Sequence, residues 1–235
     1  MTPPPGWRLR QYETVPSTSD LCATLAQAGE PAGLAVLAAR QSHGRGSRGR
    51  GWTMLPGNLA LSVLLRPTCG GMGHWALLAA VALADALAPA PVQVKWPNDV
   101  MLNGAKLGGV LLDASWAAEG RLDWLVIGFG ANLAAAPDLP GVAALPGRPD
   151  PRAVACALLG RLDHWSAQLA ADEFGPVRRA WMERGPAPGT LLRVTTGPGQ
   201  VAGTFAGLGD DGSLLLQSGG RVHAFCTGRV LQAGE

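Results

Sequence analysis

Lysine is nearly absent from this chain. The sequence of 235 residues holds nineteen Lys and Arg residues, and only Lys95 and Lys106 among them are lysines. A GC-rich genome, which also favours the many Ala, Gly and Pro residues, depletes lysine without a functional cause. A compact ammonium can nevertheless act where a planar guanidinium cannot. The segment that joins the two lysines is therefore the first place to look for chemistry.

The chain also lacks an excess of positive charge. Its net charge is +2 and 15% of its residues are charged. This excludes the broad basic field that dominates non-specific binding to nucleic acids, so any anion site must be local. With 47% hydrophobic residues, the chain can bury the core of one large domain, or of one domain with a small appendage.

Long apolar runs and paired cysteines are missing as well. The most apolar stretch, 75–88, is broken by Asp85 and stopped by Pro89, which makes it too short to span a bilayer. The first eight residues lack the apolar core of a signal peptide. The cysteines form no CxxC pair and have no His at metal spacing, which predicts reduced thiols in a cytoplasmic protein and no identifiable protein-only metal site. They are Cys22, Cys69, Cys156 and Cys226.

Hydrophobic periodicity and capping residues predict helices and strands up to residue 185. Ser17 and its polar neighbours cap a short helix that Gly29 stops. Further helices are expected at 74–88, 151–170 and 177–183, and strands at 34–39, 58–66, 92–95, 108–113 and 122–127.

The character of the chain changes at the Gly-Pro-Ala-Pro-Gly segment 185–189. Four short strands separated by turn sequences are expected after it, at 190–195, 201–208, 213–217 and 221–225. The sequence therefore predicts an α+β domain of residues 1–185 and a small all-β barrel of residues 186–235.

Between the first two strands lies a loop of glycines and arginines. Residues 44–52 read Gly-Arg-Gly-Ser-Arg-Gly-Arg-Gly-Trp, which fits neither a Walker loop nor a dinucleotide-binding Gly-x-Gly-x-x-Gly. Glycines let backbone N–H groups approach a phosphate, and arginines supply forked donors to its oxygens. We interpret the loop as an anion clamp whose Trp52 offers a flat surface to a purine. A plain surface loop and an RGG-like segment that binds RNA are the alternatives.

Lys95 stands at the end of an expected strand. Pro97 ends this strand, and Asn98 and Asp99 make the turn. A lysine at this place points either to solvent or into a site at the strand end. Taken alone, the segment favours a solvent-facing lysine beside a surface Trp.

The loop and the lysine segment, in this order, resemble biotin protein ligase. The loop 44–52 is followed by Lys-Trp-Pro-Asn-Asp at 95–99, by Lys-Leu-Gly-Gly-Val-Leu at 106–111 and by Ile-Gly-Phe-Gly-Ala-Asn at 127–132. Ser17, Thr18 and Gln41 fall where the family has its Ser-Thr-Asn and Gln positions. The resemblance covers nearly the whole chain. It implies a mixed sheet flanked by helices, as in class II aminoacyl-tRNA synthetases, and an SH3-like C-terminal domain.

This family joins biotin to ATP, forming biotinyl-5′-adenylate and pyrophosphate. It then passes the biotinyl group to one lysine of a biotin carboxyl carrier protein, such as that of acetyl-CoA carboxylase. The resemblance implies that this chain uses ATP and Mg²⁺ and modifies such a carrier. Positive charge in the site is what the reaction needs, because a carboxylate must approach a polyanionic triphosphate.

The resemblance also implies roles for individual residues. Lys95 and Arg45 would be catalytic, and Lys95 would lie against the biotin carboxyl and the α-phosphate. Lys106 would be a second basic residue or a brace for the hairpin that follows Asn103 and Gly104. The residues implied for biotin are Ser17, Thr18, Gln41, Gly44, Arg45, Lys95, Gly108 and Gly109. The arginines Arg45, Arg48 and Arg50 would fold over the phosphates, and Trp52 and Asn132 would hold the adenine of ATP or the adenylate.

Two positions depart from the family's pattern. Ser19 replaces an Asn, which puts its biotin contact in doubt, and Ser47 replaces an arginine that many members carry in the loop. We expect the adenylate to be held less tightly here than by members with the full arginine set. A Ser47→Arg variant that releases the intermediate as fast as the unchanged chain would contradict this.

The expected partners follow from the same resemblance. Some members carry an N-terminal DNA-binding domain, but residues 7–15 already look like the first element of the catalytic domain. We therefore expect a monofunctional ligase, monomeric or homodimeric, that binds neither DNA nor membranes. Lipoate protein ligase, with the same adenylate chemistry, is the nearest alternative, and segment 95–99 and the multi-arginine loop disfavour it. A nucleic-acid-binding protein is disfavoured by the charge and by the few aromatic residues in the terminal strands.

Overall fold

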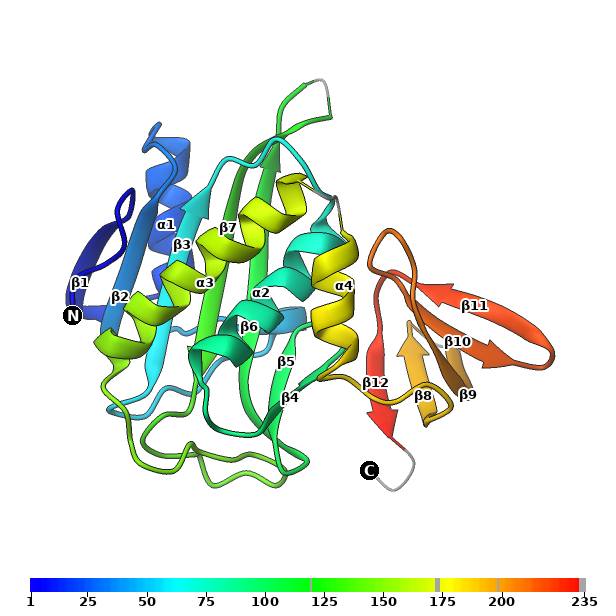
Figure 1. Cartoon of the computed structure of the whole chain (residues 1–235). Helices are drawn as coiled ribbons and strands as arrows, with labels where there is room; N and C mark the ends of the chain where they lie inside the picture. The colour runs from blue at the N-terminus through cyan, green and yellow to red at the C-terminus, as the bar shows by residue number, and fades with distance from the viewer. Residues whose placement is uncertain (119, 172–173, 198, 233–235) are drawn as a thin grey trace.

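The computed structural model describes residues 1–118, 120–171, 174–197 and 199–232 and contains two β-sheets (Figure 1). The larger sheet has seven strands in the order β1-β2-β3-β7-β6-β5-β4. β1 and β2 are parallel, whereas the other neighbours are antiparallel, which confirms the expected mixed sheet. The strands are β1 (Arg8–Val15), β2 (Leu34–Gln41), β3 (Leu59–Leu65), β4 (Val92–Lys95), β5 (Asp99–Leu102), β6 (Ala105–Trp116) and β7 (Leu122–Ala131).

Helices cover both faces of this sheet. α1 (Thr18–Gln27) packs on β2, β3 and β7, while α2 (Met72–Ala86) and α3 (Pro151–Ala171) cross the opposite face, in front of the sheet in Figure 1. Side chains alternate between the faces of a strand, so Val36 joins the small core under α1 and Ala35 joins the large core under α2 and α3. Within the described residues, no helix combines the length and apolar character needed to cross a membrane.

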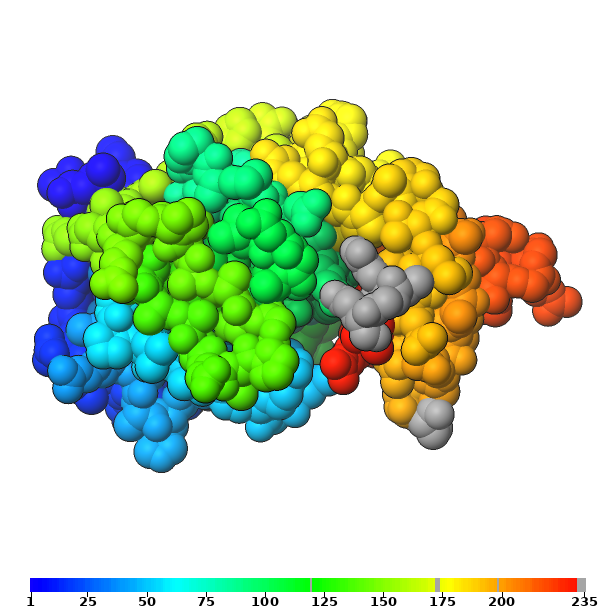
Figure 2. Space-filling view, turned by 90° about the horizontal axis from the view of Figure 1, so that it is seen from below, coloured from blue at the N-terminus to red at the C-terminus, as the bar shows by residue number. Residues whose placement is uncertain are grey.

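The smaller sheet is antiparallel, with the order β11-β10-β9-β8-β12. It follows α4 (Gly175–Met182), and its β10–β11 hairpin projects from the body in Figure 2. Its strands are β8 (Leu191–Thr196), β9 (Gly199–Leu208), β10 (Leu214–Ser218), β11 (Arg221–Phe225) and β12 (Arg229–Gln232). The sequence predicts four of them and misses β12, which is short. The pairing of the described residues leaves β11 and β12 as edges, so the sheet is consistent with an SH3-like domain but is not closed into the expected barrel.

The two sheets meet at a junction made by Gly73, Trp96, Asp211 and Gly212. The buried indole Nε1 of Trp96 donates to the Gly212 carbonyl at 3.1 Å, and a Cβ on Gly73 would collide with the Asp211 carbonyl. Buried apolar residues of both sheets form one continuous core. The division at residue 185 is therefore not a gap in packing, and it stays a prediction of the sequence.

The β4–β5 hairpin differs from the expectation in one respect that matters for the site. The turn spans residues 96–98, and Asp99 is already the first residue of β5, paired with Lys95. A bulge then interrupts the pairing of β5 with β6. Asp99 lies opposite Gly109, but Met101, two residues later, lies opposite Lys106.

Candidate active site

Two adjoining cavities open on either side of the Gly-Arg loop. The inner cavity, between α1, β6 and β7, encloses about 50 Å³, and the outer cavity encloses about 240 Å³. Gly46, Ser47 and Trp52 of the loop line both, which makes the loop a shared wall. Of the described residues, Lys106 is the one charged side chain that lines both cavities.

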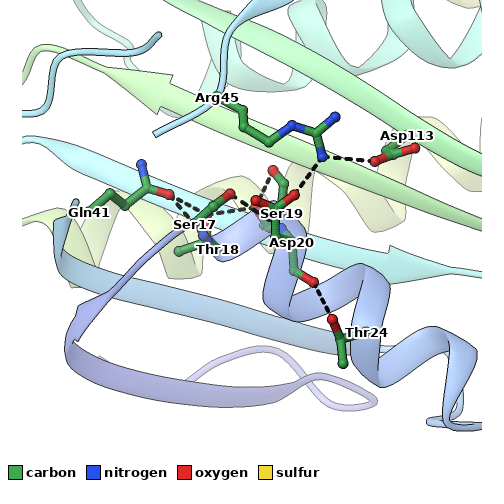
Figure 3. Close-up of polar contacts among 9 residues, drawn as sticks. Ser17, Thr18, Ser19, Asp20, Thr24, Gln41, Arg45 and Asp113 are labelled. Carbon is green, nitrogen blue, oxygen red and sulfur yellow. Dashed lines mark hydrogen bonds and ion pairs between the residues drawn. The ribbon is translucent and has the colours of Figure 1, made fainter. Parts of the chain in front are cut away.

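One end of the inner cavity is a cluster of buried hydroxyl groups at the start of α1 (Figure 3). Ser17 caps the helix, and its Oγ accepts a hydrogen bond from a first-turn backbone N–H at 3.2 Å. The hydroxyls of Thr18 and Ser19 lie 2.8 and 3.0 Å from that of Ser62. Gln41 completes the cluster, because its Oε1 accepts from the N–H and the hydroxyl of Thr18 at 2.8 and 3.1 Å.

Backbone, rather than side chains, forms the floor of the inner cavity. Gly109 of β6 pairs with Gly130 of β7, and Gly128 shares their face because strand side chains alternate. A Cβ on Gly130 would lie 2.6 Å from the Trp52 ring, so the indole rests on bare backbone. Gly108 has another role. Its Cβ would lie 2.6 Å from the Gly130 carbonyl oxygen, so its lack of a side chain lets β6 and β7 pack closely.

Lys106 reaches the site because of the bulge between β5 and β6. Asp99 and Met101 share a face of β5, and the residues opposite them, Gly109 and Lys106, share it too, although they are three positions apart in the sequence. The Lys106 Nζ donates to Asp99 Oδ1 at 2.5 Å, and both residues line the inner cavity. A charged pair therefore lies at the edge of the glycine floor.

Lys95 lies further out. It ends β4, the edge strand of the large sheet and two strands from β6, whereas Asn98 and Asp99 of the following segment line the inner cavity. Lys95 is not among the described residues that line either cavity, whereas Lys106 lines both. That Lys95 lies against the ligands stays a prediction. The bulge brings Lys106 to the inner cavity, and no local sequence pattern reveals it.

The Gly-Arg loop folds as a narrow hairpin. The Trp52 N–H donates to the Gly44 carbonyl at 2.8 Å, and a Cβ on Gly44 would lie 2.5 Å from the Trp52 oxygen, so only glycine fits this approach. Arg48 is exposed and has a φ of 60°. Arg50 lines the outer cavity, and its Nη2 donates to Ser47 Oγ at 3.4 Å. The two arginines therefore occupy different places on the loop.

Trp52 and Asn132 both line the outer cavity, where the sequence predicts the adenine. The Trp52 Nε1 is buried and has no hydrogen-bond partner among the described residues. The Asn132 amide is buried and already bonded, since its Nδ2 donates to the Ala143 carbonyl at 3.0 Å and its Oδ1 accepts from Asn58 Nδ2 at 3.1 Å. Asn132 thus supports the cavity wall, and a ligand that binds its amide would share groups that already make these hydrogen bonds.

Arg45 connects the loop to two other elements (Figure 3). Its Nη1 donates to Asp20 Oδ1 on α1 at 2.6 Å and to Asp113 Oδ2 on β6 at 3.0 Å. The hydrogen bonds from Asp20 and then Asp113 raise the pKa of the Arg45 guanidinium. Arg45 lines the inner cavity, where these two carboxylates hold it. Arg45 thus lines the inner cavity and Arg50 the outer one, and the expected fold of the arginines over the phosphates stays a prediction.

The structure therefore brings most of the predicted site residues together around the two cavities. Those that line at least one cavity are Thr18, Gln41, Arg45, Arg50, Trp52, Gly109 and Asn132. Ser17, Gly44 and Gly108 support the walls through the contacts described above. The lining residues that the prediction omitted include Asp99, Gly128 and Gly130. The alternating glycines of β7 were a readable signal for the floor.

Comparison with known proteins places this site in a family. Residues 12–132, which include the α1 hydroxyls, the Gly-Arg loop and both lysines, match the model of the biotin/lipoate A/B protein ligase family. The chain belongs to this family. The matched segment contains the described lining of the inner cavity and most of that of the outer one.

Relatives in this ligase family cover most of the chain. It is 38% identical to the biotin–[acetyl-CoA-carboxylase] ligase of Paracoccus denitrificans, over 77% of this chain and 83% of that protein. It is 33% identical to the ligase of the same name from Mycobacterium tuberculosis, over 96% of this chain and 90% of that one. The bifunctional ligase/repressor BirA of Bacillus subtilis is 30% identical, and this chain spans 70% of its length.

Solved structures show the same fold. The biotin protein ligase of Aquifex aeolicus in complex with biotin and ATP superposes with a TM-score of 0.84 at 23% identity, covering 96% of this chain and 99% of that one. The biotin protein ligase of Leishmania major in complex with biotinyl-5-AMP is 27% identical, with a TM-score of 0.59, covering 96% of this chain and all of that one.

Proposed function

We propose that the chain is a biotin–protein ligase, which activates biotin with ATP and transfers the biotinyl group to a lysine of a carrier protein. The relatives from Paracoccus and Mycobacterium are named for this activity towards acetyl-CoA carboxylase. The observation that carries the proposal is that Lys106 lines both cavities, which places one cation where two substrates in separate pockets would react.

The lining of the inner cavity matches the chemistry of biotin. Its hydroxyl end, with Thr18, Ser19 and Gln41, offers the partners that the buried ureido ring needs, because a buried amide-like edge without partners is costly. The glycine floor and the apolar Val110 and Phe129 surround the middle of the cavity. The ammonium of Lys106 then faces the carboxylate of the ligand.

The outer cavity suits the nucleotide. Trp52 provides a flat ring, and Asn132 supports the wall behind it. Arg50 brings a guanidinium to the same cavity, where a phosphate accepts its forked donors. The relative from Leishmania was solved with biotinyl-5-AMP, a molecule that joins an acyl group to a nucleotide and would span two such cavities.

In the proposed first step, a biotin carboxylate oxygen attacks the α-phosphorus of ATP and the bond to pyrophosphate breaks. Lys106 balances the negative charge that both reactants bring together. In the second step, the neutral amine of a carrier lysine attacks the acyl carbonyl, AMP leaves with the electron pair, and the amine loses a proton. Lys106 then faces the carbonyl oxygen as charge develops on it.

We propose that Mg²⁺ enters with the triphosphate. Among the described residues, no three His, Cys, Asp or Glu side chains gather as a metal site, and the outer-cavity lining that the structure describes includes no carboxylate. Mg²⁺ prefers carboxylate and phosphate oxygens. The residues present therefore do not fit a protein cage for Mg²⁺, and we derive no step from a protein-bound ion.

The proposed protein partner is the biotin carboxyl carrier domain of acetyl-CoA carboxylase or of a related carboxylase. That the chain acts in the cytoplasm, as a monomer or homodimer and without DNA, stays a prediction from the sequence. Light scattering of the purified chain and a gel-shift assay with DNA test the last two points.

Isotope exchange between labelled pyrophosphate and ATP tests the proposed activation step. We expect exchange when biotin is present and background exchange without an acid. Lipoate is the second arm, because the matching family covers ligases for both acids. Exchange that depends on lipoate rather than biotin would replace the proposed substrate, and exchange with neither acid would overturn the proposed function.

Transfer is tested separately with a purified carrier domain. We expect its mass to rise by one biotinyl group, and we expect no rise in a carrier whose acceptor lysine is changed to arginine. Labelling of both carriers to the same extent would contradict specific transfer, because it would show that free adenylate acylates any exposed amine.

A further inference from the structure

Among the described residues, Arg45 is the one member of the Gly-Arg loop that forms ion pairs with other elements. Its Nη1 joins Asp20 of α1 at 2.6 Å to Asp113 of β6 at 3.0 Å, and Figure 3 shows the guanidinium between the two carboxylates. The Arg45 side chain lines the inner cavity and is 42% exposed. It therefore lies where the cavity meets solvent, and it ties the two sides of that opening together.

Both carboxylates use the same nitrogen of Arg45. The described contacts engage Nη1 and leave Nε and Nη2 for other acceptors. Arg45 also lies at the base of the loop hairpin, where it pairs with Gly51, one residue inside the Gly44–Trp52 backbone hydrogen bond. Fixing Arg45 therefore fixes the base of the loop that separates the two cavities.

The net charge of this group is unfavourable for binding an anion next to it. One guanidinium and two carboxylates carry a net charge of −1 beside a cavity that we assign to an anionic acid. By Coulomb's law alone, Asp20 and Asp113 should repel such a ligand. Two acidic groups at this opening are therefore explained by what they do to Arg45 rather than by direct contact with the ligand.

We propose that Asp20 and Asp113 are positioning residues that latch Arg45, and with it the loop, over the inner cavity. The proposal rests on the proposed function for the identity of the ligand as biotin. The latch keeps the loop closed against α1 and β6 and turns the remaining Arg45 donors toward the cavity. Its loss opens the loop and weakens the retention of the acid more than it changes the chemical step.

Trypsin measures the position of the loop without any substrate. It cleaves after arginine, and the loop contains three exposed arginines, Arg45, Arg48 and Arg50. We expect cleavage in the loop, followed by mass spectrometry, to be about threefold faster in Asp20→Asn and in Asp113→Asn, and about tenfold faster in the double variant, as partly exposed ion pairs are lost. Asp113→Glu, which keeps the carboxylate, should restore much of the protection.

Asp123→Asn is the matched control. Asp123 forms an ion pair of similar exposure with Arg66 at 2.9 Å, at the start of β7 and outside the loop. We expect this variant to leave cleavage within the loop unchanged. The comparison separates the latch from a general effect of removing one surface carboxylate.

The KM for biotin, from pyrophosphate exchange, gives the second readout, and its sign decides between two explanations. A latch predicts that KM rises about threefold in each Asp→Asn variant while kcat changes little. Simple repulsion predicts the opposite, because removal of a negative charge would lower KM. Loop cleavage that stays unchanged, or a lower KM, would overturn the latch. If no exchange occurs in the unchanged chain, the proposed function fails, while the trypsin result still tests the latch.

Discussion

At the floor of the inner cavity, glycines leave open space on the face of the large sheet, whereas at the junction between the sheets they let two stretches of backbone touch. Gly130 makes room for the Trp52 ring, which lies 2.6 Å from where a Cβ would be. Gly73 instead admits the Asp211 carbonyl, and Gly212 packs back on Gly73. The absence of a side chain makes room for a side chain of the loop in one region, and for a backbone contact in the other.

This difference predicts which property a substitution should change in each region. A side chain added at the floor displaces a loop residue, and a loop can shift without unfolding the protein. A side chain added at the junction forces apart two elements that share one core, so its effect must appear in stability. Variants of the two regions should therefore separate activity from the free energy of unfolding.

The largest effect is expected at the charged end of the floor. Lys106→Ala should lower the rate of pyrophosphate exchange by about 10²–10³-fold, because it removes the cation common to both cavities. Lys106→Arg should not restore the rate, since a forked guanidinium cannot occupy the same point. Lys95→Ala is the paired variant, with a smaller expected loss. A greater loss for Lys95 would return the catalytic role to the residue that the sequence favoured.

The floor itself should come next. Gly130→Ala should lower exchange by about tenfold or more, because the new methyl group displaces Trp52 from the wall between the cavities. The melting temperature should change little. Gly160→Ala, in a part of α3 where a Cβ meets only ordinary contact, controls for the substitution itself. Equal activities of the two variants would show that Trp52 need not rest on the floor.

The junction should show the reverse pattern. Gly73→Ala should lower the free energy of unfolding by about 1–3 kcal/mol, measured by urea denaturation, because the Asp211 backbone cannot yield as a side chain would. Activity at low temperature should be nearly kept. Gly71→Ala is the control, since a Cβ there has open space. A Gly73→Ala variant that keeps its stability but loses activity would contradict this expectation.

The smallest effect concerns two thiols, one beside each region. Cys22 is buried against the Ser62 backbone near the floor, and burial raises its pKa to about 12, although Arg10 and a backbone hydrogen bond oppose this. Cys226 is exposed near Asp211. Iodoacetamide at pH 8 should label Cys226 and spare Cys22, as peptide mass mapping would show. Rapid labelling of Cys22 in the folded protein would contradict the buried site.

The same shift gives a pH dependence. The Cys22 thiol ionises near pH 9 when exposed and near pH 12 in the fold. Its contribution to stability is therefore complete below about pH 9 and is lost as the pH rises toward 12. A Cys22→Ala variant should show a flatter decline of the free energy of unfolding across this range.

Much of the fold could be predicted because its signals are local. Ser17 caps α1 as expected, and the Ala- and Leu-rich stretch forms α2 within two residues of the predicted bounds. β5 was missed because Asp99 was assigned to the turn, and whether it ends a turn or starts a strand depends on its pairing with Lys95. The short β12 likewise depends on its partner strand, β8.

The site could be predicted only in part, for the same reason. The loop and the α1 hydroxyls are contiguous in sequence, and they were found. The position of Lys106 in both cavities could not be predicted, because one bulge determines which residues of β6 share the face of Asp99. The catalytic role of Lys95 stays a prediction. The ion pairs of Arg45 with Asp20 and Asp113 join three separate segments, and no sequence pattern links them.

The scarcity of lysine has a consequence for the product of the proposed first step. A free acyl-adenylate acylates amines, but it leaves guanidinium groups unchanged at neutral pH. Seventeen of the nineteen basic side chains are arginines, and the side chain of Lys106 is 30% exposed and occupied by Asp99. The ligase thus offers few amines on which to label itself, so the lysine of the carrier meets little competition from the enzyme that serves it.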